Sequence, residues 1–186
     1  MIRFIQINNN KIKQIRNFTK EVIKTKINEN GYRYDNKKLY KRFYNGMLGE
    51  VAVEQFLDRS FIDWTIGQSR LYNRADLTQL GLNIGIKSVE YGKLPLVKKR
   101  PQRAEIINLI MNDNTVMIGG YASIFDLMVF SNDEMILSPY VKKKGVKTAF
   151  DGLHMLIPFN DIEELRNIDN IFSGEVNLAE KYKKVI

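Results

Sequence analysis

Two acidic residues and one basic residue have the types that metal-assisted chemistry on a phosphate group requires. Glu50 lies in the segment GMLGEVAVEQFL, Asp76 in ADL and Lys87 in GIKSV. Carboxylates are hard oxygen ligands of the kind that hold Mg²⁺, and a bound Mg²⁺ neutralises developing charge and acidifies an attacking water. A neighbouring lysine can position that water or stabilise the charged transition state. Converging at one end of a small sheet, these three side chains would suit phosphodiester hydrolysis.

The segment around Lys87 has two different faces. Side chains along a strand point alternately to opposite sides, so Leu82, Ile84 and Ile86 share an apolar face while Gly85 and Lys87 share the other. That second face carries a cation and, at the glycine, a gap. The pattern predicts a strand that is buried on one side and polar on the other. Alternatively, the lysine is a charge that discourages aggregation at the edge of a sheet.

The elements that must position these residues follow from the spacing of apolar residues. Helices are predicted over 11–27, from 35 or 36 to about 57, and as a short terminal helix with a capping-box signature at Asn160 and Glu163. Strands are predicted over 61–66, 75–79, 81–89 and 154–158, and a hairpin over 104–111 and 115–123. The segment 123–130 suits either a short helix or a strand, and basic loops are expected at 93–103 and 140–147.

Length and composition restrict the class of protein. The chain of 186 residues fits a single domain, with a helical part at about 11–57 and a sheet core at about 61–165. It has no cysteine and one histidine, which excludes thiol chemistry and multi-histidine metal sites. No apolar run approaches the roughly 18 to 20 residues needed to span a bilayer, and the amino terminus lacks a signal-peptide core. We therefore expect a cytoplasmic protein without a membrane partner.

The charge balance favours a polyanionic partner. The net charge is +8, from 29 basic and 21 acidic residues, which suits nucleic acid or an anionic surface. Two basic clusters are the candidate contacts with a DNA backbone: Lys93, Lys98, Lys99, Arg100 and Arg103 in the first, and Lys142, Lys143 and Lys144 in the second. Solvated loops are the alternative, since a lysine-rich composition also arises from AT-biased coding.

The order of GMLGEVAVEQFL, ADL and GIKSV resembles that of the PD-(D/E)xK nuclease superfamily, in a phage or plasmid type. The resemblance covers roughly residues 37–165 and extends to KSVEYGKLPLV, RAEIINLIMNDNTVMIGGYAS and LIPFNDIEEL. It implies a restriction-endonuclease-like α/β fold, with a central mixed sheet flanked by helices, and cleavage of DNA, most naturally a duplex. It also implies that Glu50 is the helix acid, Asp76 the strand acid and Lys87 the lysine of the third motif, with Mg²⁺ or Mn²⁺ as cofactor.

The third motif departs from the family pattern. Gly85 stands where the family has Glu or Asp, so one metal ligand is missing from its usual place. Glu54, one helical turn from Glu50, is the first candidate to supply it, and Glu90 and Glu105 are weaker ones. Either the ligand has moved to a neighbouring element or the site has decayed.

Purely structural roles would also account for several of these residues. Glu50 and Glu54 suit the solvated face of a helix, Asp76 suits the cap of a turn, and His154 suits a packed strand position. The alternative function is a catalytically inactive module of the same fold that binds DNA or a protein, as a regulator, inhibitor or adaptor. A homodimer and a protein partner are both compatible with the sequence.

Overall fold

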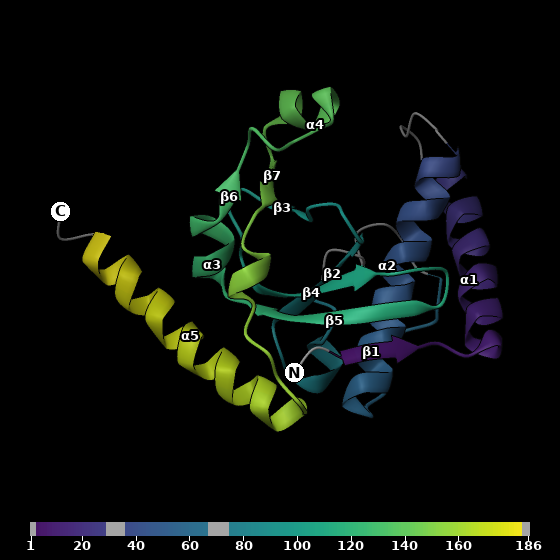
Figure 1. The fold of residues 1–186 in the computed structure, drawn as a ribbon, viewed down its shortest axis with the longest axis horizontal. Coiled ribbons are helices and arrows are strands. Elements are labelled where there is room, and N and C mark those ends of the chain that lie inside the picture. Colours follow the sequence, from purple (N-terminus) through teal and green to yellow (C-terminus); the bar gives the residue numbers. More distant parts are fainter. Residues whose placement is uncertain (1–2, 29–35, 67–74, 184–186) are drawn as a thin grey trace.

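The computed structural model describes residues 3–28, 36–66 and 75–183, and a four-stranded mixed sheet lies at its centre. The strands are β1 (Arg3–Gln6), β2 (Ile84–Glu90), β4 (Ala104–Ile110) and β5 (Thr115–Ala122). Their spatial order is β1-β5-β4-β2, so β2 forms one edge of the sheet (Figure 1). β2 runs parallel to β4, whereas the pairs β4–β5 and β5–β1 are antiparallel.

A smaller sheet and five α-helices complete the described part of the chain. The smaller sheet has the order β3-β7-β6 and consists of β3 (Leu96–Lys98), β6 (Ser131–Asn132) and β7 (Lys147–Phe150). The helices are α1 (Asn9–Asn28), α2 (Asn36–Leu57), α3 (Ile124–Val129), α4 (Pro139–Lys144) and α5 (Ile162–Lys183). This architecture confirms the predicted α/β class with a central mixed sheet flanked by helices.

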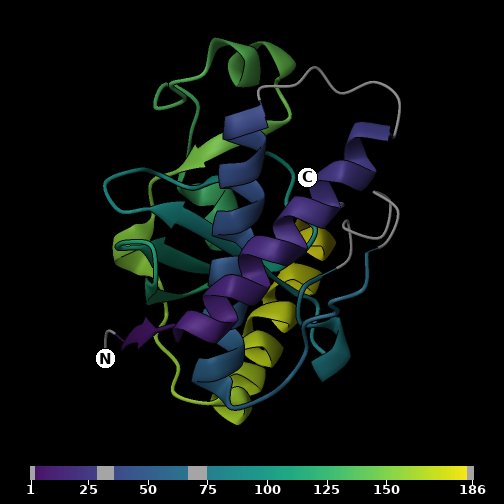
Figure 2. The same ribbon diagram turned by 90° about the vertical axis from the view of Figure 1, so that its right-hand side faces the viewer.

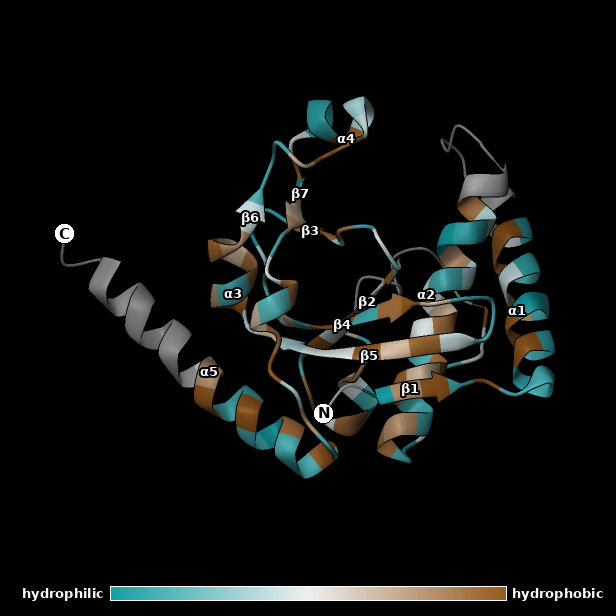
Figure 3. Ribbon diagram, viewed as in Figure 1, coloured by the Kyte–Doolittle hydropathy of each residue, from teal (hydrophilic) through white to brown (hydrophobic). Residues whose placement is uncertain are grey.

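α2 packs on one face of the four-stranded sheet, and α1 packs on α2 (Figure 2). α1 begins after Asn8, whose Oδ1 accepts a hydrogen bond from the Lys11 backbone N–H at 2.9 Å and so caps the helix. Its residues Ile12, Ile15 and Val22 are buried, and hydrophobic and hydrophilic stretches alternate along it in Figure 3. The two long helices predicted from apolar spacing are therefore confirmed. The connection between the two helices, residues 29–35, lies outside the described residues.

Gly49 lets α2 approach β2 closely. A Cβ added at Gly49 would lie 1.6 Å from Ser88 Oγ, and the Asn108 side-chain amide donates a hydrogen bond to the Gly49 carbonyl at 3.2 Å. Close packing against the sheet therefore accounts for a glycine at this position of the helix. Gly46 has open space around it, so close packing does not account for that glycine.

The other face of the sheet carries a smaller apolar cluster. Ile107 and Ala122 of the large sheet meet Val97 and Phe150 of the small sheet, with Leu127 of α3. The main core, by contrast, joins α1, α2, the large sheet and the start of α5. The small sheet thus packs against the face opposite α2, and in Figure 1 it lies with α4 above the β2 edge of the large sheet. This division places any residue at the free edge of β2 between the two layers.

Three predicted strands are wrong, because side chains and turns use the backbone groups that a strand would need. In 61–66, the Phe61 and Ile62 N–H groups both donate to Glu54 Oε1, at 2.9 and 3.0 Å. The segment 75–79 is a turn that continues into a 3-10 helix, Thr78–Leu80. The segment 154–158 likewise contains a 3-10 turn, and a single bridge joins Ile157 to Tyr121.

The two predicted basic loops contain regular structure. The stretch 93–103 includes β3, and 140–147 is mostly α4, which Ser138 caps at its start and Gly145, with a φ of 64°, ends. The ambiguous segment 123–130 is the helix α3, with a capping box between Ser123 and Asp126. The predicted hairpin is confirmed as β4 and β5, whereas β1 was not predicted.

The terminal helix differs from its prediction in length and in its cap. α5 has 22 residues and is not short. Asp161 accepts hydrogen bonds from the Glu163 and Glu164 N–H groups, and Glu164 accepts one from the Asn160 N–H, so the capping residues are shifted by one position. The cause is that Asn and Asp stand side by side there, and both are good caps.

Candidate active site

Asp76 lies at the free edge of β2, although the segment that carries it is a turn. Its Oδ2 accepts a hydrogen bond from the Ile86 N–H, and the Leu77 N–H donates to the Ile84 carbonyl at 3.1 Å. The turn therefore runs along the outer edge of β2 and occupies groups that no neighbouring strand pairs. The sequence predicted that a strand would carry Asp76. The structure has a turn there instead, and the hydrogen bond to Ile86 brings Asp76 next to Lys87.

Glu50 approaches the same edge from the α2 side of the sheet. The contact between Gly49 and Ser88 fixes the helix against β2, and Glu50 is the next residue. Its side chain is half-buried. The pKa of Glu50 is raised to about 8, first by burial and then by the negative charges of Asp76 and Glu54, while the positive charge of Lys87 acts in the opposite direction. Glu50, Asp76 and Lys87 are therefore electrostatic neighbours.

Glu105 supplies a carboxylate at the place where the third motif has a glycine. β2 and β4 are parallel, and their register sets Gly85 directly beside Glu105. A Cβ added at Gly85 would lie 2.1 Å from Glu105 Oε2 and 2.8 Å from Glu105 Cδ. The space that a side chain at position 85 would fill is thus occupied by the carboxylate of the neighbouring strand. This geometry accounts for the glycine.

Two cations hold the Glu105 carboxylate. Lys87 Nζ lies 3.6 Å and Arg103 Nε 3.7 Å from Glu105 Oε1. Glu105 is buried, with 10% of its side chain exposed, whereas 33% of the Lys87 side chain is exposed. The buried Glu105 carboxylate therefore orients the Lys87 ammonium group, while part of the Lys87 side chain stays open to solvent. This arrangement suits a lysine that acts on a ligand.

Burial opposes ionisation of the three carboxylates. The pKa of Asp76 is raised by burial, and its hydrogen bond from Ile86 and the charges of Lys87 and Arg103 act in the opposite direction. The pKa of Glu105 is also raised by burial, with Lys87 and Arg103 opposing and Asp76 reinforcing. Positive charge added at this place would relieve the repulsion among the acids.

The donor set fits a hard divalent cation that shares its coordination with water and substrate. Within the described ranges, no three His, Cys, Asp or Glu side chains are grouped tightly enough to hold a metal ion by themselves. Mg²⁺, however, is usually bound through one or two carboxylates, with waters and phosphates completing its octahedron. Glu105 Oε2 is buried and has no hydrogen-bond partner among the described residues. A buried oxygen of this kind is costly unless a ligand completes it.

The other acids that the sequence offered for the missing ligand have different partners. Glu54 Oε1 accepts hydrogen bonds from the Phe61 and Ile62 N–H groups and fixes the chain after α2. Glu90 lies at the far end of β2 and forms ion pairs with Lys41 and Lys93. The structure therefore brings Glu105, one of the weaker candidates, to Gly85. It does not bring Glu54 or Glu90 there.

The basic residues predicted to contact DNA fall into distinct settings. Arg103 lies beside the carboxylates and is half-buried. Lys93 and Lys99 form ion pairs with Glu90 and Asp133. The remaining five are exposed, namely Lys98 on β3, Arg100 after it, and Lys142, Lys143 and Lys144 in the last turn of α4. Lysines at a helix C-terminus also complement the helix dipole, which gives the α4 cluster a structural role.

Two contributions to the site escape sequence reasoning. Glu105 could be ranked only as a weak candidate, because the register of two strands twenty residues apart is not encoded locally. Lys147 ends the basic segment 140–147, but the sequence did not indicate that it lies on β7 directly opposite Lys98. The alternation of side chains along a strand shows which side of its own strand each lysine lies on. Only the pairing of β3 with β7 brings Lys98 and Lys147 together.

No family model matches the sequence, and no curated protein or solved structure shows significant similarity to it. In the part of the chain that the structure describes, no helix is both long enough and apolar enough to cross a membrane. The function of this chain therefore has to be inferred from the site itself.

Proposed function

We propose that this chain is a Mg²⁺-dependent endodeoxyribonuclease of the PD-(D/E)xK type, in which Glu105 replaces the acid missing at Gly85. One observation carries the proposal: the Glu105 carboxylate fills the space beside Gly85, within ion-pair distance of Lys87. A decayed site would have no need for a buried acid with an unpartnered oxygen at this position. A metal ligand supplied by Glu105 on β4, in place of an acid at position 85 on β2, would explain both Gly85 and the buried Glu105.

The chain's own residues would divide the chemistry among them. One or two of the carboxylates Asp76, Glu50 and Glu105 would bind the metal directly at the β2 edge, and waters and phosphate oxygens would complete its coordination. When bound, Mg²⁺ supplies charge neutralisation at the phosphate and a water of lowered pKa. Lys87, oriented by Glu105, positions the attacking water or stabilises the negative charge on the phosphate oxygens. The water oxygen bonds to phosphorus, the bond to one ester oxygen breaks, and that oxygen takes up a proton.

A cleavage assay with matched variants tests the proposal. Supercoiled, linear, single-stranded and branched DNA are incubated with the protein and Mg²⁺ or Mn²⁺. Asp76→Asn keeps an oxygen that can accept from the Ile86 N–H but removes the charge, so we expect a loss of at least about 100-fold in rate. Asp63→Asn is the control, because Asp63 is exposed and bonds only to Thr65 among the described residues.

The outcome also separates the two candidate functions. If the wild type cuts no form of DNA with either metal but still binds DNA, catalysis is rejected. The second candidate, a DNA-binding module of the same fold, would then replace it, because the exposed cations of β3 and β7 need no metal to bind a phosphate backbone. A homodimer or a protein partner remains a separate proposal, which sedimentation of the protein with and without DNA would test.

A further inference from the structure

Two lysines face each other across the small sheet. β3 and β7 are antiparallel, and their register pairs Lys98 directly with Lys147. Like charges at directly opposite positions of an antiparallel pair are destabilising. Both side chains are exposed, and within the described residues neither forms an ion pair or a side-chain hydrogen bond. The fold therefore holds two positive charges together without an acid between them.

An acid is available next to this pair, and it binds a different lysine. Lys99 follows Lys98 directly, and it is paired with Asp133. Five described lysines have an acidic partner, namely Lys24, Lys41, Lys87, Lys93 and Lys99. Asp133 therefore lies close to this part of the small sheet but pairs with Lys99, which leaves Lys98 and Lys147 without an ion pair among the described residues.

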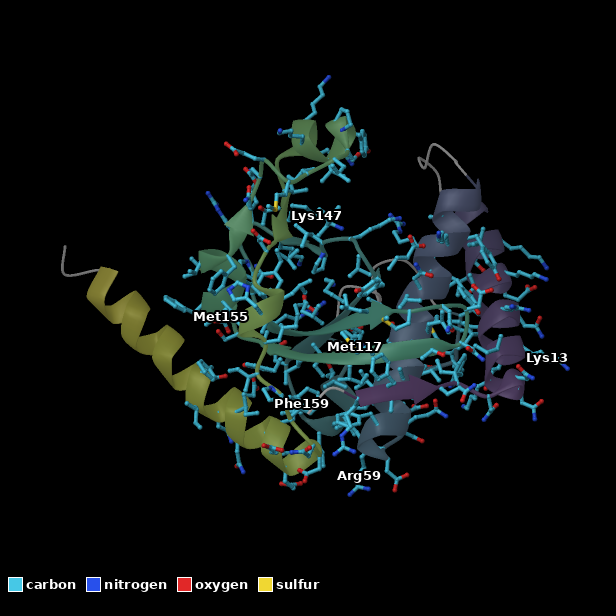
Figure 4. The ribbon with its side chains drawn as sticks, in the orientation of Figure 1. Lys13, Arg59, Met117, Lys147, Met155 and Phe159 are labelled. Carbon is cyan, nitrogen blue, oxygen red and sulfur yellow. The ribbon has the colours of Figure 1, made fainter. Side chains whose placement is uncertain are left out.

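The pair lies beside the candidate active site. Lys98 lines a cavity of about 430 Å³ together with Arg103 and Glu105. Lys147 is exposed as a residue, but partial burial of its ammonium group, and then the positive charges of Lys87, Arg42 and Lys98, lower its pKa, whereas Glu105 opposes them. Cations from α2, β2, β3 and β7 therefore act on one another across the space above the carboxylates. Figure 4 shows Lys147 between the small sheet and α2.

We propose that Lys98 and Lys147 together bind one phosphodiester group of a nucleic-acid strand, next to the group held at Lys87. An anion placed between the two lysines replaces their repulsion with two charge-assisted hydrogen bonds. Lysine binds phosphate as a point charge and reads no base, so the contact would be independent of sequence. The choice of DNA as the ligand rests on the proposed function, whereas the anion site does not require cleavage.

The test uses binding without catalysis. A fluorescent duplex and a fluorescent single strand are titrated with the full chain in EDTA, over a series of salt concentrations. We expect Lys147→Gln and Lys98→Gln each to weaken binding by about three- to tenfold and to reduce the salt slope by about one. Lys13→Gln makes the same change of net charge on α1, on the far side of the molecule in Figure 4, and should change the affinity less than twofold. Equal effects of Lys13→Gln and Lys147→Gln would overturn the proposal.

Thermal melting gives a second, independent reading. In phosphate-free buffer we expect Lys147→Gln to melt about 1–4 °C higher than the wild type, because the repulsion is removed. Added oligonucleotide should raise the melting temperature of the wild type more than that of the variant. A lower melting temperature of the ligand-free variant would show that Lys147 is structural and would overturn the proposal. Inorganic phosphate that protects the wild type as well as DNA does, at equal phosphate concentration, would overturn the assignment to a nucleic-acid strand.

The two proposals can fail separately. If the lysine variants lose DNA binding but the wild type never cuts, the nuclease is rejected and the phosphate site stands. If the wild type cuts with Mg²⁺ and Lys147→Gln keeps the wild-type KM and salt dependence, the phosphate site is rejected and the nuclease stands.

Discussion

The contact between Gly85 and Glu105 allows the site to be tested by moving its carboxylate. In Gly85→Glu, the added Cβ would lie 2.1 Å from Glu105 Oε2 and 2.9 Å from Arg103 Nε, so the side chains must shift. Overpacking of this kind costs about 1–3 kcal/mol. A second carboxylate about 4 Å from the first adds up to about 4 kcal/mol at the effective dielectric constant of a protein surface. We therefore expect a loss of about 3–5 kcal/mol of stability.

The double variant Gly85→Glu with Glu105→Ala should recover most of that loss. Glu105→Ala removes the clash and the repulsion together, so the two changes should be coupled by about 2–4 kcal/mol. At about 2–4 °C per kcal/mol for a chain of this size, the single variant should melt about 6–20 °C below the wild type and the double variant within a few degrees of it. Urea unfolding at pH 7 gives the four free energies of the cycle.

Cleavage should respond in the same way as stability. Glu105→Ala alone should lose most Mg²⁺-dependent activity, and Gly85→Glu in that background should restore part of it, because the carboxylate returns to the same space from the other strand. Additive free energies, or a double variant no more active than Glu105→Ala, would refute the idea that Glu105 stands in for the missing acid.

Two further predictions concern titration. Because the folded-state pKa of Glu50 is about 8, above its ordinary value of 4.5, the folded protein keeps a proton that the unfolded chain loses, and stability should fall as the pH rises across that window. Urea unfolding of the wild type at pH 5 and pH 8 should show this fall in stability. The fall should be smaller in Glu50→Gln and smaller when Mg²⁺ is present. Equal falls in the wild type and in Glu50→Gln would contradict the raised pKa of Glu50. Lys41 and Lys93 lower the pKa of Glu90 to about 2, so its stabilisation is present above pH 4.5 and lost as the pH falls towards 2. Glu90→Gln should cost less than about 1 kcal/mol at pH 7 and nothing at pH 2, measured by urea unfolding at both pH values.

The parts of the fold that sequence reasoning predicted are those with local causes. The period of two over 84–88 identified the strand β2 and its two faces, and the turn residues at 112–114 identified the hairpin of β4 and β5. The helical spacing of α1 and α2 was equally direct. Each of these patterns depends on neighbours within a few residues.

The parts that were missed depend on partners far along the chain. The segment 61–66 alternates like a strand, but Glu54 takes its first two N–H groups. The residues Arg3–Gln6 form a strand only because β5 pairs with them. The site shows the same limit, because alternation puts Gly85 on the polar face of β2, and only the parallel register of β2 and β4 sets Glu105 beside it.

The hydrogen bond between Asp76 and the Ile86 N–H has a consequence for the history of such a chain. An edge strand with unpaired backbone groups is a template for aggregation, and Asp76 closes one of those groups on β2. Asp76 would thus serve an active enzyme as a metal ligand, and it would still protect the sheet edge in a protein that has lost its activity. Among related sequences, an aspartate at this position would not by itself indicate activity. Substitution of Glu50, or of Lys87 and Glu105, would be a better indication that activity has been lost, because these residues do not cover the edge of the sheet.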